Sequence, residues 1–247
     1  MIKFFRHIRK SLLMENKTSK YFKYAIGEIF LVVIGILIAL QINTWNENRK
    51  NKELEKQYLN SLIIDLKLES ESFNYAVLSR FQAKTDALLL AKKYYYGDHI
   101  ITDTVNLINT VGYGGVYSSS SNFGNIATYQ ELISSSSFKL INNKTLKKDI
   151  INYYSSRDFY MEYYNNLRTG YAAFNNSLKP YNPEDKSSID TLDIKRILEH
   201  YKSEEFLNLI NQELTFGYSI YSRVKRLDKG ANELILKIEK ELNKNHD

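Results

Sequence analysis

The chain of 247 residues has no cysteine, only two prolines and a formal net charge of +6 at pH 7. The missing cysteine excludes a disulfide framework and thiol chemistry, and the scarcity of proline favours an all-α fold because few positions interrupt a helix. The whole charge excess lies in residues 1–24, since residues 25–247 carry 27 basic and 27 acidic side chains. That neutral part argues against nucleic-acid binding, which needs clustered Lys and Arg.

Residues 25–45, AIGEIFLVVIGILIALQINTW, contain the strongest signal in the sequence. Residues 29–40 carry no polar side chain, and the apolar run extends to about 18 residues, close to the roughly 20 that cross a bilayer. Tyr21 and Tyr24 before the run and Trp45 after it are expected to anchor the two membrane interfaces. No small-x-small cleavage site follows the run, so an uncleaved transmembrane helix is favoured over a removed signal peptide.

The charges beside this span predict its orientation. Residues 1–24 hold seven basic side chains and one acidic side chain, and a Lys/Arg excess next to a span stays in the cytoplasm. We therefore expect a single-pass protein of the inner (cytoplasmic) membrane, with residues 1–24 as a basic cytoplasmic arm and residues 46–247 as an extracytoplasmic helical domain. The arm itself is expected to be either an interfacial helix or a disordered tail that only sets topology.

Inside the span, Gly35 and Ala39 are four residues apart. Two small side chains at this spacing let membrane helices approach closely, so they are the predicted contacts of a homodimer. Such pairs also arise by chance in apolar helices, and the homodimer is therefore a hypothesis rather than a consequence of the motif.

A second apolar stripe follows the span. Between Leu54 and Leu88 apolar residues recur mostly four or seven positions apart, which predicts one long helix over residues 48–96 that continues from the span with little or no break. This helix is either a bundle helix that buries its stripe or a stalk that transmits a signal. Gly97 is expected to end it.

Residues 98–124 are the least regular part of the sequence. Asp103 is expected to cap a short helix over residues 104–109. The sequence GYGGVYSSSSNFG that follows resembles a phosphate loop only superficially, because it lacks a lysine and no strand precedes it. We interpret it as a loop and, if a ligand is bound, as a candidate lid. Its candidate ligand-contacting aromatics are Tyr113, Tyr117 and Phe123.

The second half of the chain is also predicted to be helical. A short helix broken by serines covers residues 125–140, and Asn142 or Asn143 caps a long helix over residues 144–178. Aromatic residues form a stripe on that long helix and are expected to be core or, in a sharper hypothesis, to line a ligand cleft between helices. The cleft residues under that hypothesis are Tyr160, Tyr164 and Tyr171.

Two further helices complete the prediction. Asp190 is expected to cap a helix that runs through His200, and Ser203 or Glu204 starts the last helix. With the helices described above, they predict a long-helix antiparallel bundle of about four main helices after the transmembrane helix.

The sequence contains no recognisable catalytic or metal-binding motif. Its four histidines are far apart and lack metal-ligand spacing, and there is no nucleophile elbow, P-loop or EF-hand. We predict no cofactor, no metal and no catalytic residue. The leading hypothesis is a non-enzymatic envelope protein whose helical domain binds a partner protein or a small ligand. The alternative is a homo-oligomeric membrane scaffold, and an enzyme comes third.

Two sequence blocks resemble a bacterial family of unknown function, domain of unknown function 6090, which occurs in Bacteroidota and relatives. They are MENKTSKYFKYAIGEIFLVVIGILIALQINTWNENRK, residues 14–50, and ATYQELISSSSFKLINN, residues 127–143, with the DIINYY that follows. The resemblance extends over the whole chain and implies a single-span membrane protein with a helical domain outside the membrane. The family pattern leads us to expect a glycine near Ser135 or Ser136, where this chain has serine. The family has no known activity, so the resemblance assigns no functional residue to this chain.

Overall fold

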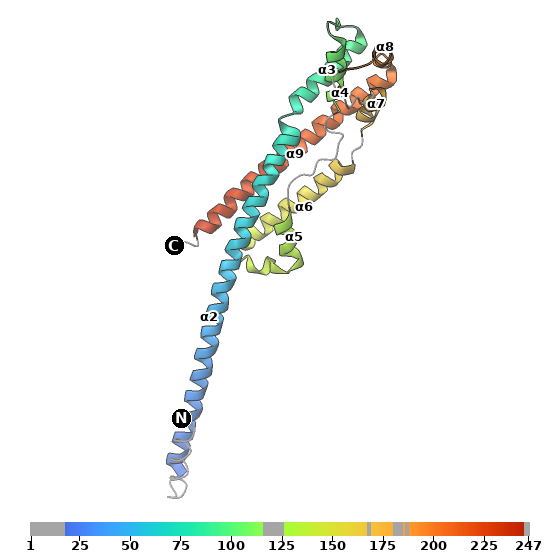
Figure 1. Cartoon of the computed structure of the whole chain (residues 1–247). Helices are drawn as coiled ribbons and strands as arrows, with labels where there is room; N and C mark the ends of the chain where they lie inside the picture. Colours follow the sequence, from blue (N-terminus) through green and yellow to red (C-terminus); the bar gives the residue numbers. More distant parts are fainter. Residues whose placement is uncertain (1–17, 116–125, 167–168, 180–184, 186–187, 245–247) are drawn as a thin grey trace. The chain divides into compact units, whose positions relative to one another are not determined.

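The computed structural model describes residues 18–115, 126–166, 169–179, 185 and 188–244, and helices dominate them throughout (Figure 1). The all-α prediction is confirmed, and the described residues contain no strand. In chain order the elements are α2 (Thr18–Phe73), the π-helical segment η1 (Asn74–Leu78), α3 (Phe81–Tyr96), α4 (Thr104–Tyr113), α5 (Ala127–Ser134), the 3-10 segment η3 (Ser137–Leu140), α6 (Lys144–Asn166), α7 (Gly170–Leu178), α8 (Thr191–His200) and α9 (Glu204–Lys244).

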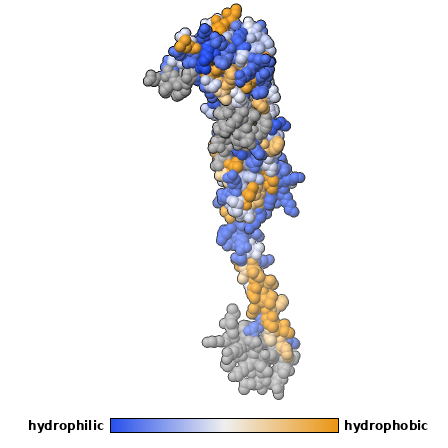
Figure 2. Space-filling view, turned by 90° about the vertical axis from the view of Figure 1, so that its right-hand side faces the viewer, coloured by the Kyte–Doolittle hydropathy of each residue, from blue (hydrophilic) through white to orange (hydrophobic). Residues whose placement is uncertain are grey.

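The chain folds as two compact units, residues 1–56 and 57–247. The first unit contains the apolar part of α2, whose side chains form a continuous apolar surface in Figure 2. None of its most apolar 18-residue window is buried inside the protein. The core helix of a soluble protein would be mostly buried, so this part of α2 is a candidate membrane span by length, composition and exposure.

The predicted long helix over residues 48–96 is present, but it contains a local irregularity that periodicity did not predict. α2 ends at Phe73, η1 follows, and the amide of Ser79 donates to the carbonyl of Asn74 at 3.0 Å, one residue farther back than in an α-helix. Phe73 and Val77 are both fully buried, so the apolar stripe stays on the core side through the irregularity. Gly97 ends α3 with a left-handed φ of 84°, as predicted.

The second unit buries two core clusters. The first core cluster joins α2, η1, α5, α6 and the C-terminal half of α9, with Leu66 and Ile150 among its fully buried members. The second core cluster joins α3, α4, α7, α8 and the N-terminal part of α9, with Phe206 among its fully buried members. α9 runs antiparallel to the α2–α3 segment, because Lys67 pairs with Glu239 and Lys92 bonds to Asn211.

The predicted helix over residues 144–178 is wrong, since the structure has two helices there. Thr169 is extended, with φ −81° and ψ 141°, and separates α6 from α7. Gly170, the first residue of α7, lies so close to α9 that a Cβ added to it would be 2.7 Å from Leu209 Cδ2. The break lets α6 pack in the first core cluster and α7 in the second. Asn143 caps α6, with its Oδ1 accepting from the amides of Thr145 and Leu146 at 3.0 Å each.

The break between α5 and η3 contains the only left-handed non-glycine residue among the described residues. Ser136 has φ 55° and ψ 23°. This position is one of the two serines where the family resemblance leads us to expect glycine. An L-residue in this region is disfavoured because its Cβ lies too close to the neighbouring carbonyl.

We expect Ser136→Gly to raise the free energy of unfolding by about 1 kcal/mol, since glycine removes that backbone strain. Urea unfolding of the full chain in mild detergent, followed by circular dichroism, measures the change. Ser155→Gly on the exposed face of α6 is the matched control, and it should lower stability by a few tenths of a kcal/mol because glycine disfavours a helix interior. A loss of stability in both variants would contradict the strain at Ser136.

Candidate functional site

A groove of about 290 Å³ lies between α6 and α9. From α6 it is lined by Asp149, Asn152, Tyr153, Ser156 and Tyr160, and from α9 by Arg226, Leu227, Gly230, Glu233, Leu234 and Lys237. These residues recur every three or four positions, so each helix contributes one face. The volume lies at the small end of the range for ligand sites.

The floor of the groove is formed where Gly230 faces Tyr153. A Cβ added to Gly230 would lie 3.4 Å from Tyr153 Cδ2, an ordinary contact distance. Close packing therefore does not require glycine here, although a glycine in a helix interior disfavours the helix by roughly 1 kcal/mol relative to alanine. Without a side chain at position 230, Tyr153 borders the groove although it is only 8% exposed.

The groove has balanced charge, with two basic and two acidic side chains. Lys237 Nζ pairs with Asp149 Oδ2 at 2.7 Å, and Glu233 pairs across one helical turn with Lys229 at 3.7 Å. The Arg226 guanidinium lies over the Tyr160 ring, 5.6 Å from its centroid. In the part of the chain that the structure describes, Arg226 forms no ion pair. A polar ligand would thus meet both signs of charge around an aromatic floor.

A buried polar network lies behind the floor. The Tyr153 hydroxyl donates to Glu69 Oε2 at 2.6 Å, and Arg157 Nε donates to the other oxygen of the same carboxylate. Burial, reinforced by the Glu69 charge, raises the pKa of the Tyr153 phenol well above its ordinary value, so the phenol keeps its proton and remains a donor. The network joins the groove on α6 to α2.

Next to this network lies an unpaired phenol. The Tyr154 hydroxyl is buried and has no hydrogen-bond partner among the described residues. Its ring stacks on Tyr129 with centroids 3.9 Å apart. Asp65, on the adjacent part of α2, accepts from the amide of Thr128 at 3.1 Å and thereby holds the start of α5.

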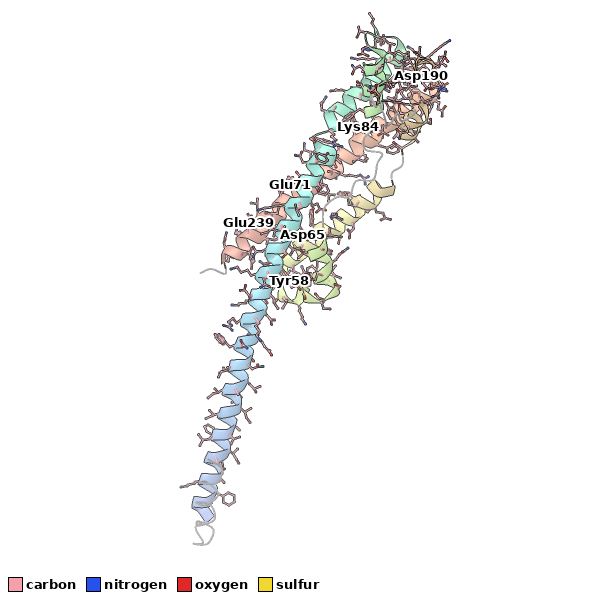
Figure 3. All side chains as sticks on the ribbon, in the orientation of Figure 1. Tyr58, Asp65, Glu71, Lys84, Asp190 and Glu239 are labelled. Atoms are coloured by element: carbon pink, nitrogen blue, oxygen red, sulfur yellow. The ribbon has the colours of Figure 1, made fainter. Side chains whose placement is uncertain are left out.

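A second buried ion pair lies in the opposite half of the unit. Lys84 of α3, labelled in Figure 3, pairs with Glu213 of α9 and also donates to the carbonyl of Gly114. Both side chains are 1% exposed, and the second carboxylate oxygen of Glu213 has no hydrogen-bond partner in the described part of the chain. Burial lowers the pKa of Lys84, and the Glu213 charge opposes that shift. The pair joins α3 to α9 without bordering the groove.

Residues 28–211 match the model of a family described as "Family of unknown function (DUF6090)". The chain belongs to the DUF6090 family. The match covers about three quarters of the chain, from the apolar part of α2 into α9, and includes the buried pair of Glu69 and Arg157 but ends two residues before Glu213. No curated protein and no solved structure matches the chain.

The structure of this DUF6090 protein separates the aromatic residues predicted to share a cleft. Tyr160 lines the groove, but Tyr171 is fully buried in the second core cluster, where its hydroxyl donates to the carbonyl of Val111 at 2.7 Å. Tyr164 lies on α6, with its side chain outside the described residues. The cleft is therefore not a tyrosine stripe along one helix, and its polar and charged partners come from α9.

Of the three aromatic residues predicted to lie in the loop, the structure describes Tyr113. Tyr113 is the last residue of α4, so the helix capped by Asp103 is longer than predicted and takes in the first residues of the expected loop. Tyr113 is 39% exposed and is not among the residues that line the groove. Tyr117 and Phe123 lie outside the described residues. The lid stays a prediction.

The residues predicted to contact a membrane lie on α2. Trp45 is 66% exposed, with Arg49 above its ring at 5.7 Å. A Cβ added to Gly35 would meet no atom within 4 Å, so packing within the described chain does not explain the small residue there. The homodimer contact through Gly35 and Ala39 stays a prediction. The side chains of Tyr21 and Tyr24 lie outside the described residues.

Sequence reasoning missed both buried ion pairs, although a signal was present. Lys84 falls on the apolar stripe of its helix, seven residues after Val77 and four before Leu88. Glu213 likewise falls between the buried Ile210 and Gly217 of α9. A charged residue at a core position needs a buried partner of opposite charge. Among the described residues, no group of three or more His, Asp or Glu side chains could hold a metal ion.

Proposed function

We propose that this DUF6090 protein is a single-pass protein of the cytoplasmic membrane whose extracytoplasmic helical domain binds a small polar ligand in the groove between α6 and α9. The basic residues 1–24 would lie in the cytoplasm, and the lipid bilayer would surround residues 25–45. The role is that of a binding protein rather than an enzyme, with a partner protein in the envelope receiving any signal.

The exposed apolar surface of α2 supports the membrane part of this proposal. Ile36, Leu37 and Ile38 are all more than half exposed. Leaving so many adjacent apolar side chains in water is unfavourable, whereas lipid covers them without cost. The Lys/Arg excess in residues 1–24 supports the orientation.

The contact between the groove and α2 is the observation that carries the binding part. Tyr153 presents its ring to the groove and its hydroxyl to Glu69, a residue of α2. A ligand that presses on this ring changes a hydrogen bond to the helix that also contains the apolar segment. Ligand binding in the groove would therefore alter a contact between α6 and α2.

The cysteine-free chain makes the predicted topology directly testable. We expect that a membrane-impermeant thiol reagent, applied to cells with a permeabilised outer layer, labels Ser187→Cys and leaves Ser11→Cys unlabelled, because only residues after the span face outward. Lysed cells provide the control, in which both variants should react. Labelling of Ser11→Cys alone in intact cells would place the helical domain in the cytoplasm and contradict the proposal.

A further inference from the structure

The charges of the groove define the kind of ligand that fits it. At one end Lys237 and Asp149 neutralise each other at 2.7 Å. Arg226 and Glu233 are left to face a ligand, and they lie seven residues apart on α9, which is two helical turns or about 10 Å along the axis. One positive and one negative side chain at this separation suit a ligand that itself carries two opposite charges.

Arg226 is positioned to receive a carboxylate. Its guanidinium lies on the Tyr160 ring, and its Nε donates to the carbonyl of Ser222 at 3.2 Å. Arg223 lies at the same distance from the Tyr160 ring but does not line the groove. The two terminal nitrogens of Arg226 suit a bidentate carboxylate, the geometry that arginine favours.

Glu233 is available for an ammonium group. Its pair with Lys229 is long, at 3.7 Å, and both side chains are more than half exposed. Such exposed pairs contribute little and exchange partners readily. Between Glu233 and Arg226 the floor is formed by Leu227, Gly230 and the Tyr153 ring, which suits the short uncharged middle of a small molecule.

We infer that the groove takes a small zwitterion of amino-acid to dipeptide size, with its carboxylate on Arg226 and its ammonium on Glu233. This inference rests on the proposed function, since it names the ligand class of the same groove. A simple anion bound to Arg226 would leave Glu233 without a positive group of the ligand, and a simple cation bound to Glu233 would leave Arg226 without a negative one. Only a ligand with both charges gains from both sides.

Calorimetric titration of the full chain in mild detergent with three probes tests the inference. Glycylglycine carries both charges, N-acetylglycine only the negative one, and glycinamide only the positive one. We expect glycylglycine to bind at least tenfold more tightly than either singly charged probe. Arg226→Gln and Glu233→Gln should each weaken glycylglycine at least tenfold, whereas Lys240→Gln, an exposed change on α9 outside the groove, should not.

The outcomes distinguish two questions: whether the ligand is a zwitterion, and whether the groove binds a ligand at all. Equal binding of N-acetylglycine and glycylglycine, lost only in Arg226→Gln, would overturn the zwitterion and keep the groove as a ligand site. Binding of no probe would overturn the inference as well. The groove's role is then tested by thiol labelling of Ser156→Cys with and without a small-molecule extract of the cell envelope. Protection would keep the proposed function, and unchanged labelling would overturn it too.

Discussion

Replacing Lys84 by alanine is expected to lower the free energy of unfolding by about 3–5 kcal/mol. The substitution leaves the Glu213 carboxylate in the core, 1% exposed, without its positive partner. It also removes the donor to the carbonyl of Gly114. Urea unfolding of the full chain in mild detergent, monitored by circular dichroism, measures the loss.

Two further variants distinguish a buried charge from a lost contact. Lys67→Ala removes a cation whose pair with Glu239 is 3.8 Å long and largely exposed, so it should cost less than about 1 kcal/mol. The double substitution Lys84→Met and Glu213→Leu replaces the buried pair by apolar side chains and should recover most of the stability. If Lys84→Ala cost no more than Lys67→Ala, the ion pair would not be buried in solution.

Glu69→Ala is expected to lower the free energy of unfolding by about 3 kcal/mol or more, because it leaves the buried Arg157 without its carboxylate. The Tyr153 hydroxyl loses its acceptor in the same change. Asp158 lies 3.8 Å from Arg157 at the surface and offsets only part of the loss. The same urea unfolding experiment measures the effect.

Two nearby substitutions serve as comparisons for the stability loss in Glu69→Ala. Glu71→Ala, two residues along α2 on its exposed face, should change stability by less than about 0.5 kcal/mol. Tyr153→Phe removes one hydrogen bond but keeps the ring on the groove floor, and should cost about 1 kcal/mol. Equal effects of Glu69→Ala and Glu71→Ala would show that the network does not hold α6 to α2.

Local signals predicted the ends of helices well. Asp103, Asn143 and Asp190 each accept from a backbone amide two or three residues ahead, so the interaction is contained within a few residues of sequence. Gly97 ends α3 for an equally local reason, its left-handed backbone. Such features depend little on the rest of the fold, and reading the sequence is enough to find them.

Features set by packing were not predictable in the same way. Apolar and aromatic residues continue in helical register through η1 and past Thr169, so the pattern gave no sign of either irregularity. The groove combines residues of α6 with residues of α9 that lie far away in the sequence, as Asp149 and Lys237 do. Tyr160 was predicted as a cleft residue, but nothing in the sequence around it identifies Arg226 as its partner.

The long α9 constrains how this protein can change during evolution. This helix of 41 residues contributes to both core clusters. Phe206 and Ile210 belong to the second core cluster, and Val224 and Ile238 belong to the first. Inserting or deleting one residue between these two groups would rotate one group by about 100° around the helix relative to the other. The apolar side chains of that group would then point away from their core cluster. Length variation among relatives should therefore concentrate in the connections between helices, while α9 keeps its residue count.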